Sequence, residues 1–227
     1  MSLKKLLFVT LCILFFQITS AQRNYQEFNH LGISGGIGFF DIETDNFLTE
    51  QGSGYIFAFT TRGMYYNRFD LIYGISFVQN QVGIFANNPG DPSNSFQSQY
   101  VNYTIQAAQI TLLTSYNIVR NHLSLEVGPI LNVNGKLKLD SNSFKDFILE
   151  GYETLKAEDI QNVSKVHFFV AGGITAGIEN FRLGAQYQYG VTNLFNRFND
   201  IAEIEKPAEE KYNGHASTIL LMAIFYF

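Results

Sequence analysis

The chain contains 227 residues, a length that suits one domain or one barrel. Hydrophobic residues make up 46% of it and aromatic residues 15%, whereas charged residues make up only 15%, well under the roughly 25% of ordinary soluble domains. The formal net charge of −5 argues against a nucleic-acid partner, because phosphate groups are neutralised by basic side chains.

The first 21 residues have the organisation of an export signal. Lys4 and Lys5 form a short basic segment, residues 6–16 are apolar, and the small residues before position 22 predict cleavage after Ala21. The apolar run is short for a membrane-spanning helix, and an uncleaved anchor is the alternative. We therefore expect a signal peptide at 1–21 and a mature domain at 22–227.

The predicted mature domain is acidic and has no thiol. Removing Lys4 and Lys5 from the fifteen basic residues leaves thirteen against twenty acidic ones, a formal charge of −7. Cys12, the only cysteine, lies in the predicted signal peptide. The sequence therefore predicts neither a disulfide nor a thiolate metal site after export.

Eight segments of the mature domain show the period-two alternation of β-strands. In the first of them, "LGISGGIGFF", apolar residues alternate with glycine and serine. No segment offers the roughly eighteen consecutive apolar residues of a membrane-spanning helix. The predicted strands are residues 31–40, 55–66, 70–84, 100–118, 123–139, 166–178, 181–191 and 215–227.

The fourth segment changes phase along its length. Its apolar residues occupy odd positions from Val101 to Ile105 and even positions at Ile110 and Leu112. An extra residue in one strand would reset the two faces, so this change predicts a β-bulge near residues 107–108.

The fifth segment has the most regular alternation. One predicted face is apolar, and the other is polar or small, with Lys136 and Lys138 at its far end. The predicted apolar face comprises Leu123, Leu125, Val127, Leu131, Val133, Leu137 and Leu139.

Short and long connections alternate along the whole chain. The turns "YNRF", "VRNH" and "IENF" are tight, whereas the connections at 41–54, 85–99, 140–165 and 192–214 are long and polar. In the third of these, apolar residues near helical spacing predict a short helix. This alternation is typical of an all-β, transmembrane, antiparallel up-and-down barrel of about eight strands, with short periplasmic turns and long extracellular loops.

The last segment, "HASTILLMAIFYF", is apolar on both faces. Ile219, Leu221, Ala223, Phe225 and Phe227 share one face and are expected to contact lipid, while the strand pairs with the first one and closes the barrel. The apolar residues that point inward, at 220, 222 and 224, argue against a wide water-filled pore and favour a narrow, filled interior.

This ending resembles the C-terminal targeting signal of Gram-negative outer-membrane proteins, an apolar strand that ends in an aromatic residue. The mature chain as a whole resembles small outer-membrane β-barrels of the OmpA/OmpX-like or PorT-like kind. The resemblance implies a location in the outer membrane, contact with outer-membrane lipid, and recognition of Phe225 and Phe227 by the barrel-assembly machinery during biogenesis.

Three charged residues fall on predicted inner faces: Arg62, Glu126 and Arg182. A buried charge is costly unless it is paired, so we expect these residues to form one interior charge network that braces a narrow barrel. A proton or ion path is the alternative, because ionisable groups inside a membrane often mark one.

A possible catalytic group occurs at "HLSLE", which brings His122, Ser124 and Glu126 onto one face. The His-x-Ser pair resembles that of outer-membrane lipid A deacylases. However, residues two apart in a strand are nearly 7 Å apart, and His122 lies beside a turn predicted to be periplasmic. We therefore predict no catalytic residue and keep a deacylase-like hydrolase as the alternative.

The long loops offer two further alternatives. His167 and His215 lie near acidic residues of the last loop, at 203, 205, 209 and 210, but their spacing matches no metal motif, so no metal and no cofactor is predicted. The loops also contain aromatic residues, expected to pack as a lid or as an interface girdle rather than to bind a partner. These aromatic residues are Phe96, Tyr152, Phe195, Phe198 and Tyr212.

The sequence thus favours a non-enzymatic integral barrel that serves surface interaction or envelope organisation. A lipid-modifying enzyme and a narrow channel are the rival functions. An extracellular or envelope protein partner is compatible with the long loops, but no residue pattern specifies one.

Overall fold

A computed structural model describes residues 29–89, 98–202, 204–207 and 211–227. The predicted signal peptide at 1–21 and the loop residue Phe96 lie outside these ranges, as do the acidic residues 203, 209 and 210. Within the described part of the chain, no helix is both long and apolar enough to cross a membrane.

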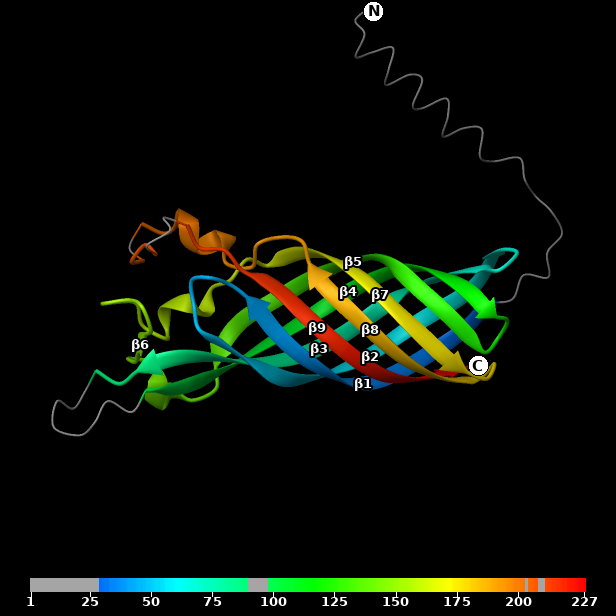
Figure 1. Cartoon of the computed structure of the whole chain (residues 1–227), viewed down its shortest axis with the longest axis horizontal. Helices are drawn as coiled ribbons and strands as arrows, with labels where there is room; N and C mark the ends of the chain where they lie inside the picture. Colours follow the sequence, from blue (N-terminus) through cyan, green and yellow to red (C-terminus); the bar gives the residue numbers. More distant parts are fainter. Residues whose placement is uncertain (1–28, 90–97, 203, 208–210) are drawn as a thin grey trace, which may run out of the picture.

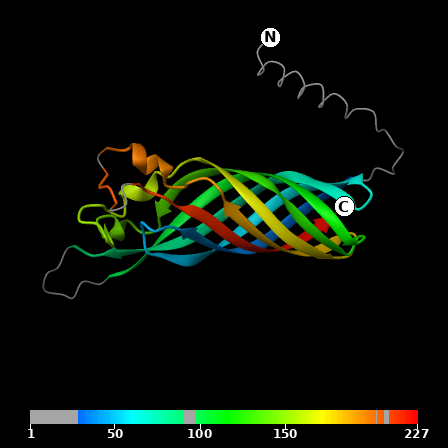
Figure 2. The same cartoon turned by 45° about the horizontal axis from the view of Figure 1, so that its top comes forward.

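Eight long strands form one closed antiparallel barrel (Figures 1 and 2). Each long strand pairs with the next, and the last strand, β9, pairs with β1 from Gly32↔Tyr226 to Glu43↔His215, which closes the ring. This confirms the predicted up-and-down barrel. Its strands are β1 (Asn29–Glu43), β2 (Thr49–Tyr66), β3 (Phe69–Asn87), β4 (Gln99–Val119), β5 (Leu123–Leu139), β7 (Val166–Gly177), β8 (Phe181–Gly190) and β9 (His215–Tyr226).

The two ends of the barrel differ in their connections. At one end, which we call the turn end, lie the three short turns and Phe227, and Asn67 and Asn121 have positive φ angles of 55° and 63°. Asparagine tolerates this left-handed conformation better than most residues, which permits tight reversals. The other four connections lie at the opposite end, which we call the loop end (Figure 1). The first of them is shorter than the predicted connection at 41–54, because β1 and β2 extend into it and leave only residues 44–48 between them.

The outer wall near the turn end is covered by apolar side chains. On β1, Leu31 and Ile37 are more than half exposed, and on β4 so is Ile110. Leu221 and Phe225 of β9 also point outward, while Leu220 and Ile224 are buried inside, as the sequence predicted. Together the strands present a continuous apolar band.

The polarity of the two faces reverses along β4 although the direction of the side chains does not, and the predicted bulge at 107–108 is wrong. β3 and β4 pair without a register shift from Phe69↔Tyr116 to Ala86↔Gln99, so odd-numbered residues of β4 point inward throughout. Near the loop end, Val101 and Tyr103 are fully buried inside the barrel. The phase change in the sequence arises because, toward the loop end, the inner face of the strand becomes apolar and the outer face becomes polar.

The bulge lies on β5 instead. Asn134 pairs with Ala107, and the next pair is Leu137 with Ile105, so β5 contains the extra residue. Leu137 is consequently fully buried, while Lys136 and Lys138 are exposed, which corrects the predicted faces for this part of the strand. The bulge allows β5 to keep apolar residues outward near the turn end and inward near the loop end.

The long loops fold over the loop end and share its apolar core. The loop after β5 contains two short 3₁₀ helices, η2 (Asn142–Phe144) and η3 (Asp159–Gln161), and not the single helix that its sequence predicted. Between them, the two-residue strand β6 (Ile148–Leu149) pairs with Ala86 and Asn87 of β3. A third 3₁₀ helix, η4 (Asn196–Asp200), lies in the loop before β9.

Candidate functional site

The polar interior near the turn end is built around Arg62 of β2. Its guanidinium donates to Oδ2 of Asp70 at 2.8 Å and to Oε1 of Glu126 at 3.2 Å. It also donates to Oγ of Ser115 and Ser124 at 2.8 and 2.9 Å. The planar guanidinium, with five N–H donors, can satisfy several acceptors on different strands at once.

Arg182 of β8 lies in the same network but forms no direct hydrogen bond to a carboxylate of the described residues. Its guanidinium donates to Ser124 Oγ at 2.9 Å and to Thr175 Oγ1 at 3.3 Å. Thr175 donates in turn to Glu126 Oε1 at 2.8 Å, so two hydroxyl groups connect Arg182 to the charge pair. The three residues singled out in the sequence therefore lie together.

Asp70 is the member of the network that the sequence reading missed. Asn117 Nδ2 also donates to its Oδ2 at 2.9 Å, and Asp70 and Arg62 are both nearly inaccessible to solvent. With Asp70 included, two arginines face two carboxylates, which balances the formal charge. The alternation of β3 would have revealed it, because Asp70 has the same parity as the inward-facing Gly74 and Ser76.

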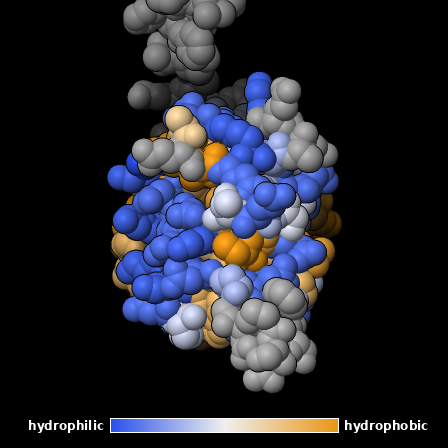
Figure 3. Space-filling model, turned by 90° about the vertical axis from the view of Figure 1, so that its left-hand side faces the viewer, coloured by the Kyte–Doolittle hydropathy of each residue, from blue (hydrophilic) through white to orange (hydrophobic). Residues whose placement is uncertain are grey.

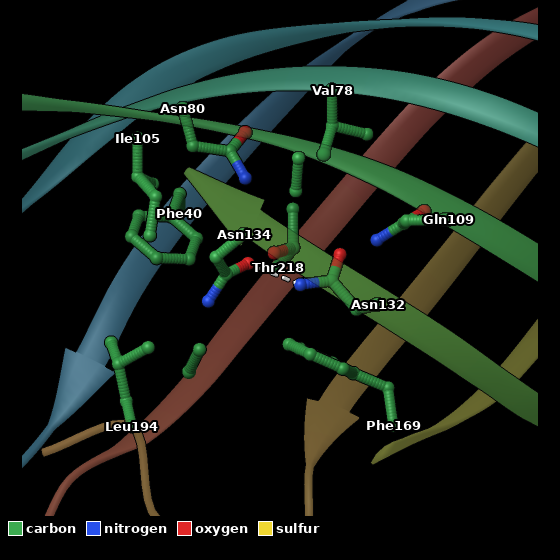
Figure 4. Close-up of a pocket in the computed structure, with 12 residues that line it drawn as sticks. Phe40, Val78, Asn80, Ile105, Gln109, Asn132, Asn134, Phe169, Leu194 and Thr218 are labelled. Carbon is green, nitrogen blue, oxygen red and sulfur yellow. Dashed lines mark hydrogen bonds between the residues drawn. The ribbon is translucent and has the colours of Figure 1, made fainter. Parts of the chain in front are cut away.

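Midway along the barrel, apolar and polar side chains together surround a cavity of about 20 Å³ (Figure 4). That space is about enough for one water molecule. Asn132 and Asn134 form a side-chain hydrogen bond at its wall, and Gln109 donates to Gln188 Oε1 at 3.0 Å across the interior. This part of the lumen is filled by side chains rather than open.

Aromatic side chains from several loops pack on one another above the cavity. Phe195, Phe198 and Tyr212 are fully buried, and the ring of Phe47 lies 5.2 Å from that of Phe195 and 5.7 Å from that of Tyr212. We call these four residues the lid core. Loop aromatic residues therefore pack inward, while the surface of the loop end is mostly hydrophilic (Figure 3).

Glu205 connects two of the loops that form the lid. Its carboxylate accepts hydrogen bonds from the backbone N–H of Glu153, Thr154 and Leu155 at 2.6–3.1 Å, and from the hydroxyl of Thr154 at 2.8 Å. Partial burial acts to raise the pKa of Glu205, but these hydrogen bonds outweigh it and hold the pKa below its ordinary value. The ionised carboxylate is thus the form that joins the loops.

Acid should therefore loosen the contact between the two loops. A carboxyl group with a lowered pKa in the folded state stabilises it above the pKa of the unfolded state, and this stabilisation is lost as the pH falls through the folded-state pKa. Between about pH 7 and about pH 3, protection of the Thr154 and Leu155 amides from hydrogen exchange should fall. Glu205→Gln should remove this pH dependence, and Glu179→Gln at the turn end should not. Unchanged protection across that range would contradict the assignment.

The histidines and the serine considered for chemistry have structural contacts. Ser124 donates to Asn117 Oδ1 at 3.0 Å and accepts from two arginines, while Nδ1 of His122 lies 2.8 Å from the carbonyl oxygen of Gly177. His167 contacts Thr192 and Ser164, and His215 stacks on Tyr189. Among the described residues, no group of three His, Cys, Asp or Glu residues is arranged to hold a metal.

Comparison with known proteins gives matches among solved structures. No protein-family model and no curated protein sequence matches the chain. Neisserial surface protein A is 10% identical, with a TM-score of 0.48, and the match covers 87% of this chain and 97% of that one. The outer membrane protein OprG from Pseudomonas aeruginosa is 12% identical, with a TM-score of 0.46, and the match covers 88% and 97%.

Ail, the attachment invasion locus protein of Yersinia pestis, solved in complex with the heparin analogue sucrose octasulfate, is 16% identical. Its TM-score is 0.46, and the match covers 88% of this chain and 99% of that one. These proteins resemble the chain in fold. At such identities the likeness extends no further than that.

Proposed function

We propose that the chain is an integral outer-membrane β-barrel of a Gram-negative envelope, with a filled lumen and no catalytic site. Its loop end would serve surface interaction or envelope organisation. The observation that carries this proposal is the reversal of polarity between the outer and inner faces along the strands. The wall is apolar outside and polar inside near the turn end, and polar outside and apolar inside near the loop end.

This reversal is expected for a barrel that lies partly in the hydrocarbon of a membrane and partly in water. Large apolar side chains exposed on every strand are unfavourable in water but favourable in hydrocarbon, where a closed sheet also leaves no backbone group unpaired. A strand needs about 9–11 residues to cross a bilayer, and β3 and β4 have 19 and 21. The extra length would stand in water, where an apolar interior and a polar surface are stable.

Orientation follows from the connections. In outer-membrane barrels the short turns are periplasmic and the longer loops extracellular. The packed lid would then be the part of the protein that other molecules meet outside the cell, and an extracellular or envelope protein would be its partner. The export role of residues 1–21 and the targeting role of Phe225 and Phe227 stay predictions.

Surface interaction is better supported than the rival functions. Between the lid core and the Arg62 network, the lumen holds a cavity of about 20 Å³, which offers no continuous path for ions. Ser124 is fully buried and hydrogen-bonded to arginine side chains, a position that favours neither nucleophilic attack nor access to lipid. The geometry therefore gives little support to a channel or to a deacylase-like hydrolase.

Cysteine labelling tests the location and the orientation together. A cysteine at Asn142 or Asn199 in the loops should react with an impermeant maleimide on intact cells, whereas one at Asn67, Asn121 or Asn180 in the turns should react only after the outer membrane is opened. All five lie in connections and not within the eight barrel strands. Labelling of the turn positions in intact cells would overturn the orientation, and labelling of neither set would overturn the surface location.

A further inference from the structure

The outer wall contains a recess at the edge of the apolar band that lies nearer the loop end. It spans β2 to β5, has a volume of about 540 Å³, and opens away from the lumen. The row of side chains nearer the turn end runs across four strands: Phe57 pairs with Phe77, Phe77 with Ala108, and Ala108 with Val133. Because Ala108 is small and its neighbours are large, the wall is hollowed there.

The rim of the recess nearer the loop end is polar. Gln106 Nε2 donates to Gln79 Oε1 at 2.6 Å. On the loop-end side of the apolar band, these two side chains form the first row of outward-facing polar residues. Tyr55 and Gly135 complete that row on either side. The recess therefore crosses the boundary between an apolar and a polar environment, as an amphipathic ligand would require.

Three exposed lysines lie close to this recess: Lys136 and Lys138 follow it on β5, and Lys165 comes just before β7, beside Asn134. Lys136 comes next after Gly135, and Lys138 pairs in register with Thr104, two residues from Gln106. The carbonyl oxygen of Lys165 accepts from the amide of Asn134 at 2.7 Å.

Three lysines elsewhere at the loop end have side-chain partners, whereas none is found for Lys136, Lys138 or Lys165 among the described residues. Lys145 and Lys156 lie against Asp146, and Lys206 donates to backbone carbonyls. Among the described residues, no ion pair is formed by Lys136, Lys138 or Lys165. Asp140, on the same face, accepts from Gln81 and Thr104. Between Val133 and Asp140, and at Lys165 beside them, three lysines thus accompany one carboxylate, in a chain whose residues 22–227 are acidic overall.

We propose that the recess binds one acylated, phosphate-bearing lipid of the leaflet at the loop end. An acyl chain would lie in the hollow over Ala108, between Phe77 and Val133. The phosphate would be held by the three lysines, which supply the opposite charge at headgroup level. This inference rests on the proposed membrane location and adds to it a lipid-specific site on the outer wall.

Diphosphoryl lipid A is a suitable probe, with phosphatidylcholine as its zwitterionic counterpart. The full-length barrel would be placed in nanodiscs containing both lipids, and lipid retained on the released protein would be counted by native mass spectrometry. The wild type should retain about one lipid A molecule in preference to phosphatidylcholine. Lys136→Gln/Lys138→Gln/Lys165→Gln should weaken that retention about tenfold or more. Ala108→Phe, which fills the hollow, should weaken it as well.

Two control variants match these changes. Arg68→Gln/Arg120→Gln/Lys211→Gln removes three positive charges from other exposed positions. Ala176→Phe adds a phenyl ring at an outward-facing position near the turn end. Both control variants should retain as much lipid A as the wild type. Equal retention of the two lipids, or no loss in either recess variant, would overturn the site and leave only ordinary annular lipid. Failure of all variants and the wild type to insert into the bilayer would instead contradict the proposed membrane location.

Discussion

Replacing Arg62 with leucine should destabilise the folded barrel by about 3–5 kcal/mol. Arg62 is the charged partner of both Asp70 and Glu126, and all three side chains are nearly inaccessible to solvent. Without it, two carboxylates remain in the interior with hydroxyl and amide partners alone. Urea unfolding in detergent micelles, followed by circular dichroism or by the heat-dependent shift in gel mobility, would measure the loss.

Matched variants separate charge from packing. Arg68→Leu changes an exposed arginine in the adjacent turn and should alter stability by no more than about 0.5 kcal/mol. Arg62→Leu/Asp70→Asn removes one charge of each sign, leaves Arg182 with Glu126, and should recover much of the loss, because uncompensated charge is the main cost. Wild-type stability of Arg62→Leu would show that the network does not brace the barrel, and an ion path through these residues would then merit conductance measurements.

Phe195→Ala should open the lid while leaving the barrel folded. Phe195 is fully buried, and its ring lies 5.2 Å from Phe47 and 5.5 Å from Phe198. Removing a buried aromatic ring costs about 3–5 kcal/mol. We expect the loops to take most of this loss, because the hydrogen bonds between neighbouring strands close the barrel without them. Limited proteolysis should cut the loops at 140–165 and 192–214 much faster, while thermal unfolding of the barrel changes little.

A second phenylalanine supplies the control. Phe168 points outward on β7 with 54% of its surface exposed, so Phe168→Ala should leave the loops as resistant to protease as in the wild type. If Phe195→Ala leaves the loops equally resistant, the lid core does not hold them. If it unfolds the barrel as well, the prediction is wrong, and lid and barrel form one cooperative unit.

Much of the fold could be predicted because its main constraint is local. Alternation along each strand identifies two faces, and the regular exchange of tight turns with long loops fixes the order and direction of the strands. The inward direction of Arg62, Glu126 and Arg182 follows from the same alternation. Asp70 was equally accessible to this reasoning, since its parity marks it as inward.

Alternation does not show whether a face contacts lipid, water or other side chains. Only the tertiary structure decides that. The inner faces of β4 and β5 near the loop end are apolar because distant loop residues, including Phe47, Phe195 and Tyr212, pack against the same core. In the sequence alone, Val101, Tyr103 and Leu137 therefore resemble lipid-facing residues. The sequence by itself determined the closed eight-stranded barrel. Contacts between residues far apart in the chain decide the position of the bulge, the packing of the lid and the partners of Arg62. The periodicity of the sequence contains no information about such contacts.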